Sequence, residues 1–387
     1  MAWKVNNLMS QRYEFCHLAS EPGANISALC QLFGVSRKTG YKWLKRYHET
    51  GCFAEHSRRP HYSPARTDPA IAEHVVALRH DYPYWGPRKL HRLLRDSLPA
   101  EQVPALVTVA RILKRKGLIN PKPSPPPQVD WQRFAWPCPN DLWQMDLQAP
   151  LRLPQGHKIY PVGLLDDHSR YLVGLWMLPN CTDDRLLSCW VEAARGHGLP
   201  QRTLTDHGPQ FRMEDHQTSA FRVYLWACGV DHTQGRIAHP QTQGKIERFF
   251  RTLNLEVFSR HAYQDLASWQ ACLADWRQQY NHLRPHQELG DEVPASRYKT
   301  SSKPFIEPDR RNHEGQPDSL YRRVNERGWT SLSGQLLMIG RGFAGWTIEA
   351  RPLGSGCWHF YFKDHFIREY IISQPGQKGC RSRAKGG

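Results

Sequence analysis

Residues 239–254 (HPQTQGKIERFFRTLN) constrain the fold of this chain more than any other stretch, because their apolar side chains recur at helical spacing. Apolar residues at steps of four, three and four mark one buried helix face: Ile246, Phe250, Leu253 and, just beyond the stretch, Val257. Polar residues follow the same kind of spacing on a neighbouring face: Gln243, Glu247, Arg251 and Asn254. We expect Glu247, the single carboxylate of the stretch, to be either one arm of a cation site or half of an ordinary Glu/Arg pair on a solvated helix.

The length and charge of the chain limit which classes of protein it can belong to. The chain has 387 residues, which is too long for one ordinary core and predicts two to four domains. A hydrophobic content of 40%, with 14 Trp and 15 Tyr, is typical of a globular protein. The formal net charge is +16, and residues 1–130 hold 20 Lys and Arg against 10 Asp and Glu. A polyanion is the natural partner of such a segment, and nucleic acid is favoured over a membrane because no amphipathic anchor accompanies the charge.

The cysteines indicate a reducing compartment. Ten are scattered from Cys16 to Cys380, and no two are spaced as CxxC. This disfavours zinc ribbons, zinc fingers and a dense disulfide framework. The N-terminus lacks the apolar run of a signal peptide, and no segment approaches the ~18 to 20 apolar residues of a membrane span. We therefore expect a soluble, cytoplasmic protein with no membrane partner.

Residues 25–47 (NISALCQLFGVSRKTGYKWLKRY) predict a helix-turn-helix within a domain over residues 1–60. The apolar side of its first helix is expected to comprise Leu29, Leu32 and Phe33. Gly34 allows the turn, Val35 is expected to fill the angle between the helices, and Ser36 caps the second helix. That second helix carries the basic residues that would enter a major groove: Arg37, Lys38, Lys42, Lys45 and Arg46. The alternative is a plain helical hairpin with a charged surface.

A second helical module is expected over residues 66–120, after a basic linker over residues 56–68 that either follows a groove or is a tether. Three apolar stripes define its helices: Ile71, Val75 and Leu78; Leu90, Leu93 and Leu94; Val109, Ile112 and Leu113. The basic residues outside these stripes are further expected DNA contacts: Arg88, Lys89, Arg111, Lys114 and Arg115. Residues 121–135 begin with PKPSPPP and predict a stiff linker.

Beyond that linker the composition shifts to strands. β-rich runs at residues 142–148, 159–166 and 171–178 are separated by turn signals, and predict three antiparallel strands. Thr182 is expected to cap a helix that carries Asp183 and Asp184 in its first turn. Further elements are expected as follows: short strands at residues 202–206 and 230–233, and helices at residues 218–229 and 266–281. Together these elements predict an α/β domain over residues 136–300.

Three carboxylates of this domain come from three different elements. Asp146 lies inside the first strand (LWQMDLQ), where an unpaired carboxylate disfavours folding unless something binds it. Asp206 ends a strand (TLTDHGPQF), and Glu247 lies on the helix described above. Oxygen ligands with open positions suit Mg²⁺ or Mn²⁺, whereas zinc would favour His or Cys. Competing acids have local roles at turns or a helix start, and we keep Asp166 only as a supporting residue.

Five motifs, in this order along the chain, resemble those of the retroviral-integrase-like DDE transposases, in particular bacterial insertion-sequence transposases. They are LWQMD around Asp146, LLDDHSRYLVG at residues 164–174, TDHGPQF around Asp206, HPQTQGKIER around Glu247, and YNHLRPHQEL at residues 280–289. The resemblance covers residues 131–298 closely and both ends more loosely. It implies a ribonuclease-H-like core in which Asp146, Asp206 and Glu247 are the catalytic triad and bind Mg²⁺ or Mn²⁺, with two ions per active site.

Two features depart from the family's pattern. Forty residues separate Asp206 from Glu247, a few more than usual, and we assign the excess to a loop over residues 213–218. His207 stands where Asn is commoner after the second acid, and we expect it to orient a water or phosphate. Neither departure removes a metal ligand.

Short strands between glycines, at residues 335–339, 345–351, 358–362 and 367–371, predict a small β-barrel over residues 316–373, after a polar linker. Residues 374–387 predict a disordered basic tail. The fold class is therefore multidomain: N-terminal helix-turn-helix modules, a ribonuclease-H-like core and a C-terminal β-barrel. The barrel either helps to bind DNA or a second subunit, as the family implies, or is purely structural.

The resemblance implies a DNA transposase that binds the terminal inverted repeats of its element, cleaves the 3′ ends and joins them to target DNA. Two ends require two protomers, so a homodimer or larger assembly on the double-stranded DNA of a bacterial nucleoid is expected. Side chains around Glu247 are expected either to contact DNA or to form a solvated face: Gln243, Lys245, Arg248, Arg251 and Asn254. The alternatives are a DNA-binding regulator with an inactive core and a metal-dependent nuclease that does not join ends.

Overall fold

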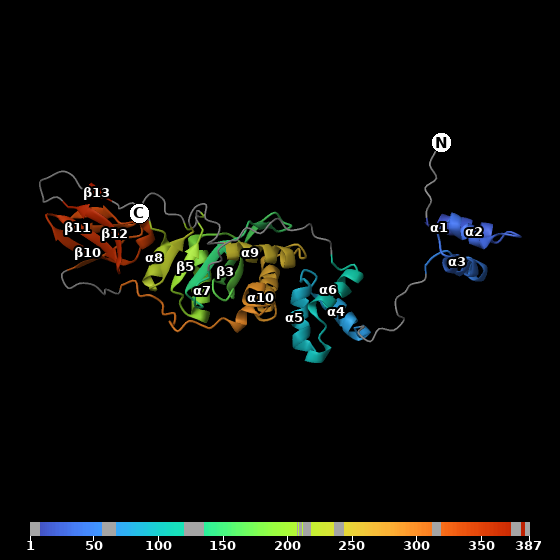
Figure 1. Cartoon of the computed structure of the whole chain (residues 1–387). Helices are drawn as coiled ribbons and strands as arrows, with labels where there is room; N and C mark the ends of the chain where they lie inside the picture. Colours follow the sequence, from blue (N-terminus) through green and yellow to red (C-terminus); the bar gives the residue numbers. More distant parts are fainter. Residues whose placement is uncertain are drawn as a thin grey trace, which may run out of the picture. The chain divides into compact units, whose positions relative to one another are not determined.

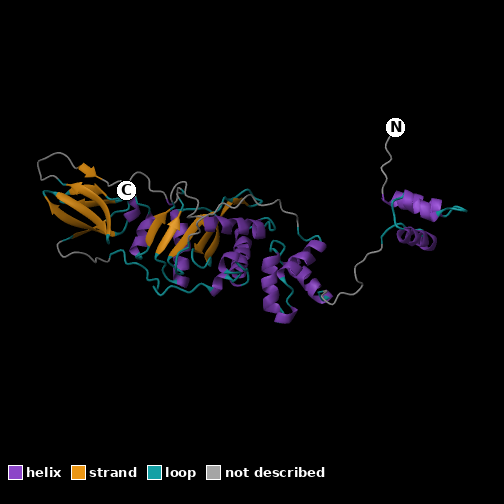
Figure 2. Cartoon of the chain, in the orientation of Figure 1, coloured by secondary structure: helices purple, strands orange, loops and turns teal. Residues whose placement is uncertain are grey.

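The computed structural model describes residues 8–55, 67–119, 135–206, 208, 211, 218–235, 244–311 and 319–372, and the backbone of residues 381–383. The chain divides into two compact units, Met1–Thr67 and Asp68–Gly387. The first unit and the start of the second are helical, and the rest combines helices with two larger sheets (Figures 1 and 2). Within the described ranges, none of the helices has the length and apolarity of a membrane span.

The first unit contains three helices, α1 (Leu8–Ala19), α2 (Ile26–Leu32) and α3 (Arg37–Thr50). The predicted turn is confirmed: Gly34 has a φ of 64°, and the Ser36 hydroxyl caps α3 by accepting the Thr39 amide at 3.2 Å. The core consists mainly of Phe15, Cys16, Ala19, Cys30 and Trp43.

The expected roles of Leu32 and Val35 were wrong. Leu32 is 76% exposed and Val35 is 36% exposed. The reason is that α1 supplies aromatic and small side chains to the space between α2 and α3. This helix lies outside the predicted helix-turn-helix motif. α2 therefore buries only Cys30 completely, and its last turn faces solvent.

The second helical module opens the second unit with α4 (Pro69–Asp81), α5 (Pro87–Ser97) and α6 (Leu106–Arg115). All three predicted stripes contribute to one core, in which Val75, Leu90 and Leu113 are fully buried. Trp85, in the turn before α5, joins this core and was not predicted.

A mixed sheet forms the centre of the second unit (Figure 1). Its strands are β1 (Leu142–Leu147), β2 (Leu151–Arg152), β3 (Lys158–Asp166), β4 (Leu172–Leu178), β5 (Arg202–Thr205) and β6 (Asp231–Gln234). β3 pairs antiparallel with both β1 and β4, as predicted, whereas β5 runs parallel to β1 and to β6. The resulting order β4-β3-β1-β5-β6, with β2 beside β3, is the mixed sheet expected of a ribonuclease-H-like core.

Helices cover both faces of this sheet. α7 (Asp183–His197) and α8 (Ala220–Ala227) pack with Trp143, Met145 and Leu164 on one face. α9 (Gly244–Leu253), its π-helical continuation η3 (Asn254–Phe258) and α10 (Leu266–His282) pack on the other. The predicted apolar face of α9 is confirmed, since Ile246, Phe250, Leu253 and Val257 are all buried.

The C-terminal region is a sheet, but a closed barrel is not shown. Its strands are β7 (Leu320–Arg323), β8 (Trp329–Leu332), β9 (Gln335–Met338), β10 (Thr347–Gly354), β11 (Cys357–Phe362), β12 (His365–Ile371) and β13 (Arg381–Arg383). Five strands form an open sheet of order β13-β12-β11-β10-β7, while β8 and β9 form a separate hairpin. In the described structure β8 and β9 pair only with each other, so they do not bridge the two edges of the larger sheet. β13 lies within the stretch predicted to be disordered.

Candidate functional site

Strand pairing brings Asp146 and Asp206 to the same face of the sheet. Gln144 of β1 lies opposite Leu204 of β5 in a parallel pair, so Asp146 and Asp206, each two residues further along, are aligned. Trp143 and Met145 pack toward α7, and alternation along β1 therefore turns Asp146 toward α9. Asp206 follows β5 directly, and its Oδ1 accepts the Gly208 amide at 3.0 Å, which orients the carboxylate.

Glu247 approaches this face from α9, which packs directly on the strand next to Asp146. Asp146 pairs with Gly163 of β3. A methyl group at Gly163 would lie 2.9 Å from a ring carbon of Phe249 and 3.2 Å from one of Phe250. The two rings therefore rest on sheet backbone, and the first turn of the same helix carries Glu247, whose side chain is exposed.

The carboxylates of Asp206 and Glu247 act electrostatically on Asp146. The pKa of Asp146 is raised to about 7, first by burial and then by the charges of Asp206 and Glu247, against the lowering effect of the Leu147 amide that donates to Oδ1. Among the described side chains, however, the three acids do not bring one oxygen each within 4.8 Å of the other two. The acids Asp206 and Glu247 are thus near enough to affect the pKa of Asp146, but the three acids do not form a closed set of metal ligands.

A divalent cation fits this arrangement. Burial raises the free energy of the ionised Asp146 carboxylate, and the charges of Asp206 and Glu247 add to that cost. A hard cation with oxygen ligands removes that cost and leaves positions open for water and phosphate oxygens. The strand-end acids Asp146 and Asp206 and the exposed Glu247 are the residues that would hold it.

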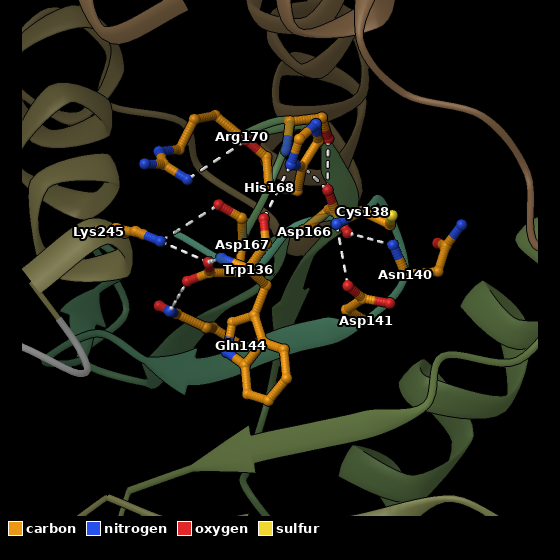
Figure 3. A network of polar contacts seen from close by, with 11 residues as sticks. Trp136, Cys138, Asn140, Asp141, Gln144, Asp166, Asp167, His168, Arg170 and Lys245 are labelled. Atoms are coloured by element: carbon orange, nitrogen blue, oxygen red, sulfur yellow. Dashed lines mark hydrogen bonds and ion pairs between the residues drawn. The ribbon is translucent and has the colours of Figure 1, made fainter. Parts of the chain in front are cut away.

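Two other acids organise the neighbouring turn (Figure 3). Asp166 is fully buried: its Oδ1 accepts the Asn140 amide at 2.8 Å, and its Oδ2 accepts both the amide and the hydroxyl of Ser169, at 2.8 and 2.5 Å. Asp167 is 2% exposed and accepts the Trp136 amide at 2.9 Å. These bonds fix the turn between β3 and β4, so Asp166 supports the fold around the site.

Lys245 connects this network to α9. Its ammonium forms an ion pair with Oδ2 of Asp167 and donates to the Asp167 carbonyl at 3.3 Å (Figure 3). Gln144 donates to the other carboxylate oxygen at 2.7 Å. Because Lys245 lies two residues before Glu247, its ion pair fixes the first turn of α9. Lys245 was expected to contact DNA or to lie on a solvated face, and this role was not predicted, since no spacing signals a pair of residues 78 positions apart.

The expected DNA contacts of the first unit differ in their surroundings. Arg37 and Lys38 are exposed at the start of α3, near the exposed side chain of Tyr41. The other three make local interactions: Lys42 with Glu55 at 3.4 Å, Lys45 with Glu49 at 3.8 Å and Arg46 with the Ala54 carbonyl at 2.9 Å. Arg37 and Lys38 are therefore the best-placed groups of α3 for a phosphate or base.

The basic residues of the second module also differ in their surroundings. Arg111, Lys114 and Arg115 of α6 are exposed. Arg88 of α5 instead contacts Asp291 of the core, with 2.6 Å between Nε and Oδ2. Lys89 is held beside the same part of the core, and burial, with a smaller effect of Arg284, lowers its pKa to about 7. These two residues serve contacts within the chain.

Around α9, three of the expected DNA contacts lie in the described structure besides Lys245. Arg248 is 61% exposed and lies 3.5 Å from Glu288, and Arg251 is exposed. Asn254 is half-buried in η3. Gln243, like His207, residues 213–217 and most of the two expected linkers, lies outside the described residues.

Family models match both halves of this architecture. A model described as an integrase core domain matches residues 137–240, and a second of the same description matches residues 228–294. Models described as homeodomain-like domains match residues 7–54 and 39–113. The matches to the integrase core include Asp146, Asp206 and Glu247.

Several curated proteins are similar to this chain. An uncharacterized 39.2 kDa protein of insertion element IS476 from Xanthomonas euvesicatoria is 27% identical over 60% of this chain and 65% of its own length. An uncharacterized 31.7 kDa protein of insertion element IS407 from Burkholderia multivorans is 26% identical over 69% of this chain and 87% of its own length. The transposase InsD of insertion element IS2 from Escherichia coli is 25% identical over 57% of this chain and 74% of its own length. The chain thus spans slightly less than two thirds of the first of these relatives.

Among solved structures, a simian T-cell lymphotropic virus intasome matches 73% of this chain and 91% of its own, at 17% identity and a TM-score of 0.37. The HTLV-2 integrase catalytic core domain, solved in complex with magnesium, matches 42% of this chain and 97% of its own, at 16% identity and a TM-score of 0.33. The residues matched by the two integrase-core models span the motifs around the three acids. The chain is therefore similar to proteins of bacterial insertion elements, and it matches models of homeodomain-like domains ahead of an integrase core.

Proposed function

We propose that this protein cleaves the 3′ ends of a DNA element and joins them to target DNA, using Asp146, Asp206 and Glu247 as its catalytic acids. What supports the proposal is that these three groups, from β1, the end of β5 and the first turn of α9, lie near one another, where burial first and then the charges of Asp206 and Glu247 raise the pKa of Asp146. A solvated helix with an ordinary ion pair would not explain why Glu247 acts on Asp146, a half-buried acid of a strand.

The three acids are proposed to hold Mg²⁺ or Mn²⁺, with two ions per site. When bound, the cation supplies Lewis acidity for displacement at phosphorus. Asp146 must lose its proton before it can serve as a ligand, because its pKa lies near 7. Lys245 and Asp167 hold the first turn of α9, and through it Glu247, in place.

The chemistry consists of two displacements at phosphorus. In cleavage, a water oxygen forms the new P–O bond while the 3′ oxygen of the element leaves and takes up a proton. In joining, that 3′ oxygen loses its proton and attacks a target phosphodiester, whose own 3′ oxygen leaves. No covalent intermediate with the protein is required, which agrees with a site built from carboxylates alone.

Terminal DNA is proposed to bind through the helical modules, with Arg37, Lys38 and Arg111 among the contacts. Arg248 and Arg251, on the exposed side of α9, are proposed to contact phosphates near the cleaved bond. Because two ends must be joined in one event, we propose a homodimer or larger assembly on DNA.

A cleavage assay tests the role of the acids. The full chain is incubated with labelled DNA that carries the ends of the element, with Mg²⁺ or Mn²⁺. Asp146→Asn, Asp206→Asn and Glu247→Gln should each lower the cleavage rate at least about 10²-fold while binding to the same DNA persists. Asp275→Asn, an exposed acid of α10, is the matched control and should cleave normally. Variants that cleave at the wild-type rate would contradict the proposal.

A second assay separates a transposase from its two rivals. Precut DNA ends with free 3′-OH groups are offered together with a supercoiled plasmid. Joined products support the proposal, and hydrolysis without joining would mean a metal-dependent nuclease. Binding to the ends with neither product would mean a DNA-binding regulator.

A further inference from the structure

The C-terminal sheet carries three metal-ligating side chains that the proposed chemistry does not use. Cys357 and His359 lie two residues apart on β11, and Glu369 lies on β12. His359 pairs with Glu369 across the strands, and alternation turns Cys357 to the same face as His359. One ligand atom from each residue lies within 4.8 Å of the other two, an arrangement found at this one place among the described residues.

We propose that Cys357, His359 and Glu369 form a Zn²⁺ site with one further position for water. Zn²⁺ takes thiolate, imidazole and carboxylate ligands in tetrahedral geometry, at distances that separate the ligand atoms by roughly 3.3–3.8 Å. The observed spacing lies close enough to that range for small side-chain rotations to complete it. The thiolate also favours Zn²⁺ over Mg²⁺, which prefers oxygen ligands alone.

Hydrogen bonds already orient these groups toward a common point. His359 Nε2 lies 2.9 Å from Glu369 Oε2, and the Cys357 sulfur lies within 4.8 Å of ligand atoms of both residues. On the other side of the imidazole, the Tyr361 hydroxyl lies 3.5 Å from Nδ1. A partner on the nitrogen away from the metal fixes the ring and its tautomer, as is usual for metal-binding histidines.

The ligands are accessible to solvent, and the strands that carry them are packed on the core. The side chains of His359 and Glu369 are 23% and 31% exposed, so a cation reaches them from solvent. On the opposite face of the same strands, Phe360 and Tyr370 are buried in the core and pack edge to face. The strands that carry the three ligands are therefore held by the core beneath them.

A simple cross-strand ion pair would explain the contact between His359 and Glu369, but it gives no role to the thiol within reach of both. This site was not predicted, because its ligands are spaced as Cys-x-His with a Glu ten residues later. The usual zinc signatures place paired cysteines or histidines in one turn. Here the pairing of two strands supplies the third ligand.

Titration of the full chain with Co²⁺ as a spectroscopic substitute for Zn²⁺ tests the proposal. The protein is kept reduced, and excess Mg²⁺ occupies oxygen-only sites. We expect one equivalent of Co²⁺ to produce a thiolate-to-metal charge-transfer band, which Zn²⁺ then removes. The acids Asp146, Asp206 and Glu247 cannot produce this band because they contain no sulfur, so the result is independent of the proposed catalytic function.

Substitutions assign the band to its ligands. Cys357→Ser should abolish it, and His359→Gln and Glu369→Gln should each weaken Co²⁺ binding at least tenfold. Cys52→Ser, which removes an exposed thiol in the first unit, is the matched control and should leave the band unchanged. Circular dichroism checks folding, and His359→Gln, which keeps the thiol, replaces Cys357→Ser if the latter does not fold. A folded wild-type protein without the band, or a band that survives Cys357→Ser, overturns the proposal.

Discussion

At the scale of the residue, Asp146 carries an electrostatic cost that should be visible in stability. Its pKa is raised in the folded chain to about 7 from an ordinary value of 3.8. Between these values the folded state binds more protons than the unfolded state, so the metal-free protein should lose stability as the pH rises through this window. Above about pH 7, Asp146 is ionised in both states and the full cost is present.

Asp146→Asn removes that cost. We expect the metal-free variant to melt several degrees above the wild type at about pH 8 and close to it at about pH 4, where the wild-type group is protonated in the fold. Thermal melts in the presence of a chelator measure the difference, with Asp275→Asn as the control. Equal melting temperatures of wild type and Asp146→Asn at the higher pH would mean that the pKa of Asp146 is not raised in the folded chain.

Protonation of Asp146 should compete with binding of the cation. Because Asp146 must be deprotonated to serve as a ligand, the affinity for Mn²⁺ should fall up to about tenfold for each pH unit below about 7 and level off above it. Isothermal titration calorimetry between about pH 5.5 and pH 8.5 gives this profile. An affinity that does not change over that range would show that Asp146 is not a ligand.

At the scale of the element, the placement of Glu247 depends on how closely α9 approaches the sheet. Gly163→Val would push branched carbons into Phe249 and Phe250, which already lie 2.9 and 3.2 Å from the position of a Cβ. We expect a loss of about 1–3 kcal/mol in the free energy of unfolding and a weaker response to Mn²⁺. Denaturant unfolding with and without the cation measures both effects.

Gly196→Ala is the matched control for that substitution. Gly196 lies on α7, and a Cβ there would have no other atom within 4 Å. The change should be neutral or stabilise the helix by up to about 1 kcal/mol. If Gly163→Val unfolds no more easily than the wild type, the contact between α9 and β3 does not position the site.

The sequence predicted the elements of this site better than their contacts. The spacing of Ile246, Phe250 and Leu253 was sufficient to predict the buried face of α9, and Asp146 was correctly placed within a strand. Periodicity reports which side of a helix is buried, but it does not identify the partner. It therefore could not predict that Lys245 pairs with Asp167.

The C-terminal region shows the same limit. Short strands were predicted there from glycines and apolar runs, and β9 to β12 (residues 335–371) agree with that prediction. The barrel could not be derived from the strands, because closure depends on which edges pair. In the described structure the sheet ends at β7 and β13, and neither of these strands was predicted.

At the scale of the whole molecule, the structure separates basic residues available to DNA from those used within the chain. Arg37 is exposed, whereas Arg88 lies 2.6 Å from Asp291. The slope of the logarithm of DNA affinity against that of salt concentration should therefore become shallower by about 0.9 in Arg37→Ala. Arg88→Ala should change the slope much less. Fluorescence anisotropy over a range of salt concentrations measures both, and equal effects would contradict this division.

The central claim is that Asp146, Asp206 and Glu247 serve one cation site, and anomalous diffraction from crystals grown with Mn²⁺ tests it most directly. We predict an anomalous peak in contact with the carboxylates of Asp146 and Asp206, with Glu247 drawn toward it. Crystals saturated with Mn²⁺ that show no peak against these carboxylates would contradict the account.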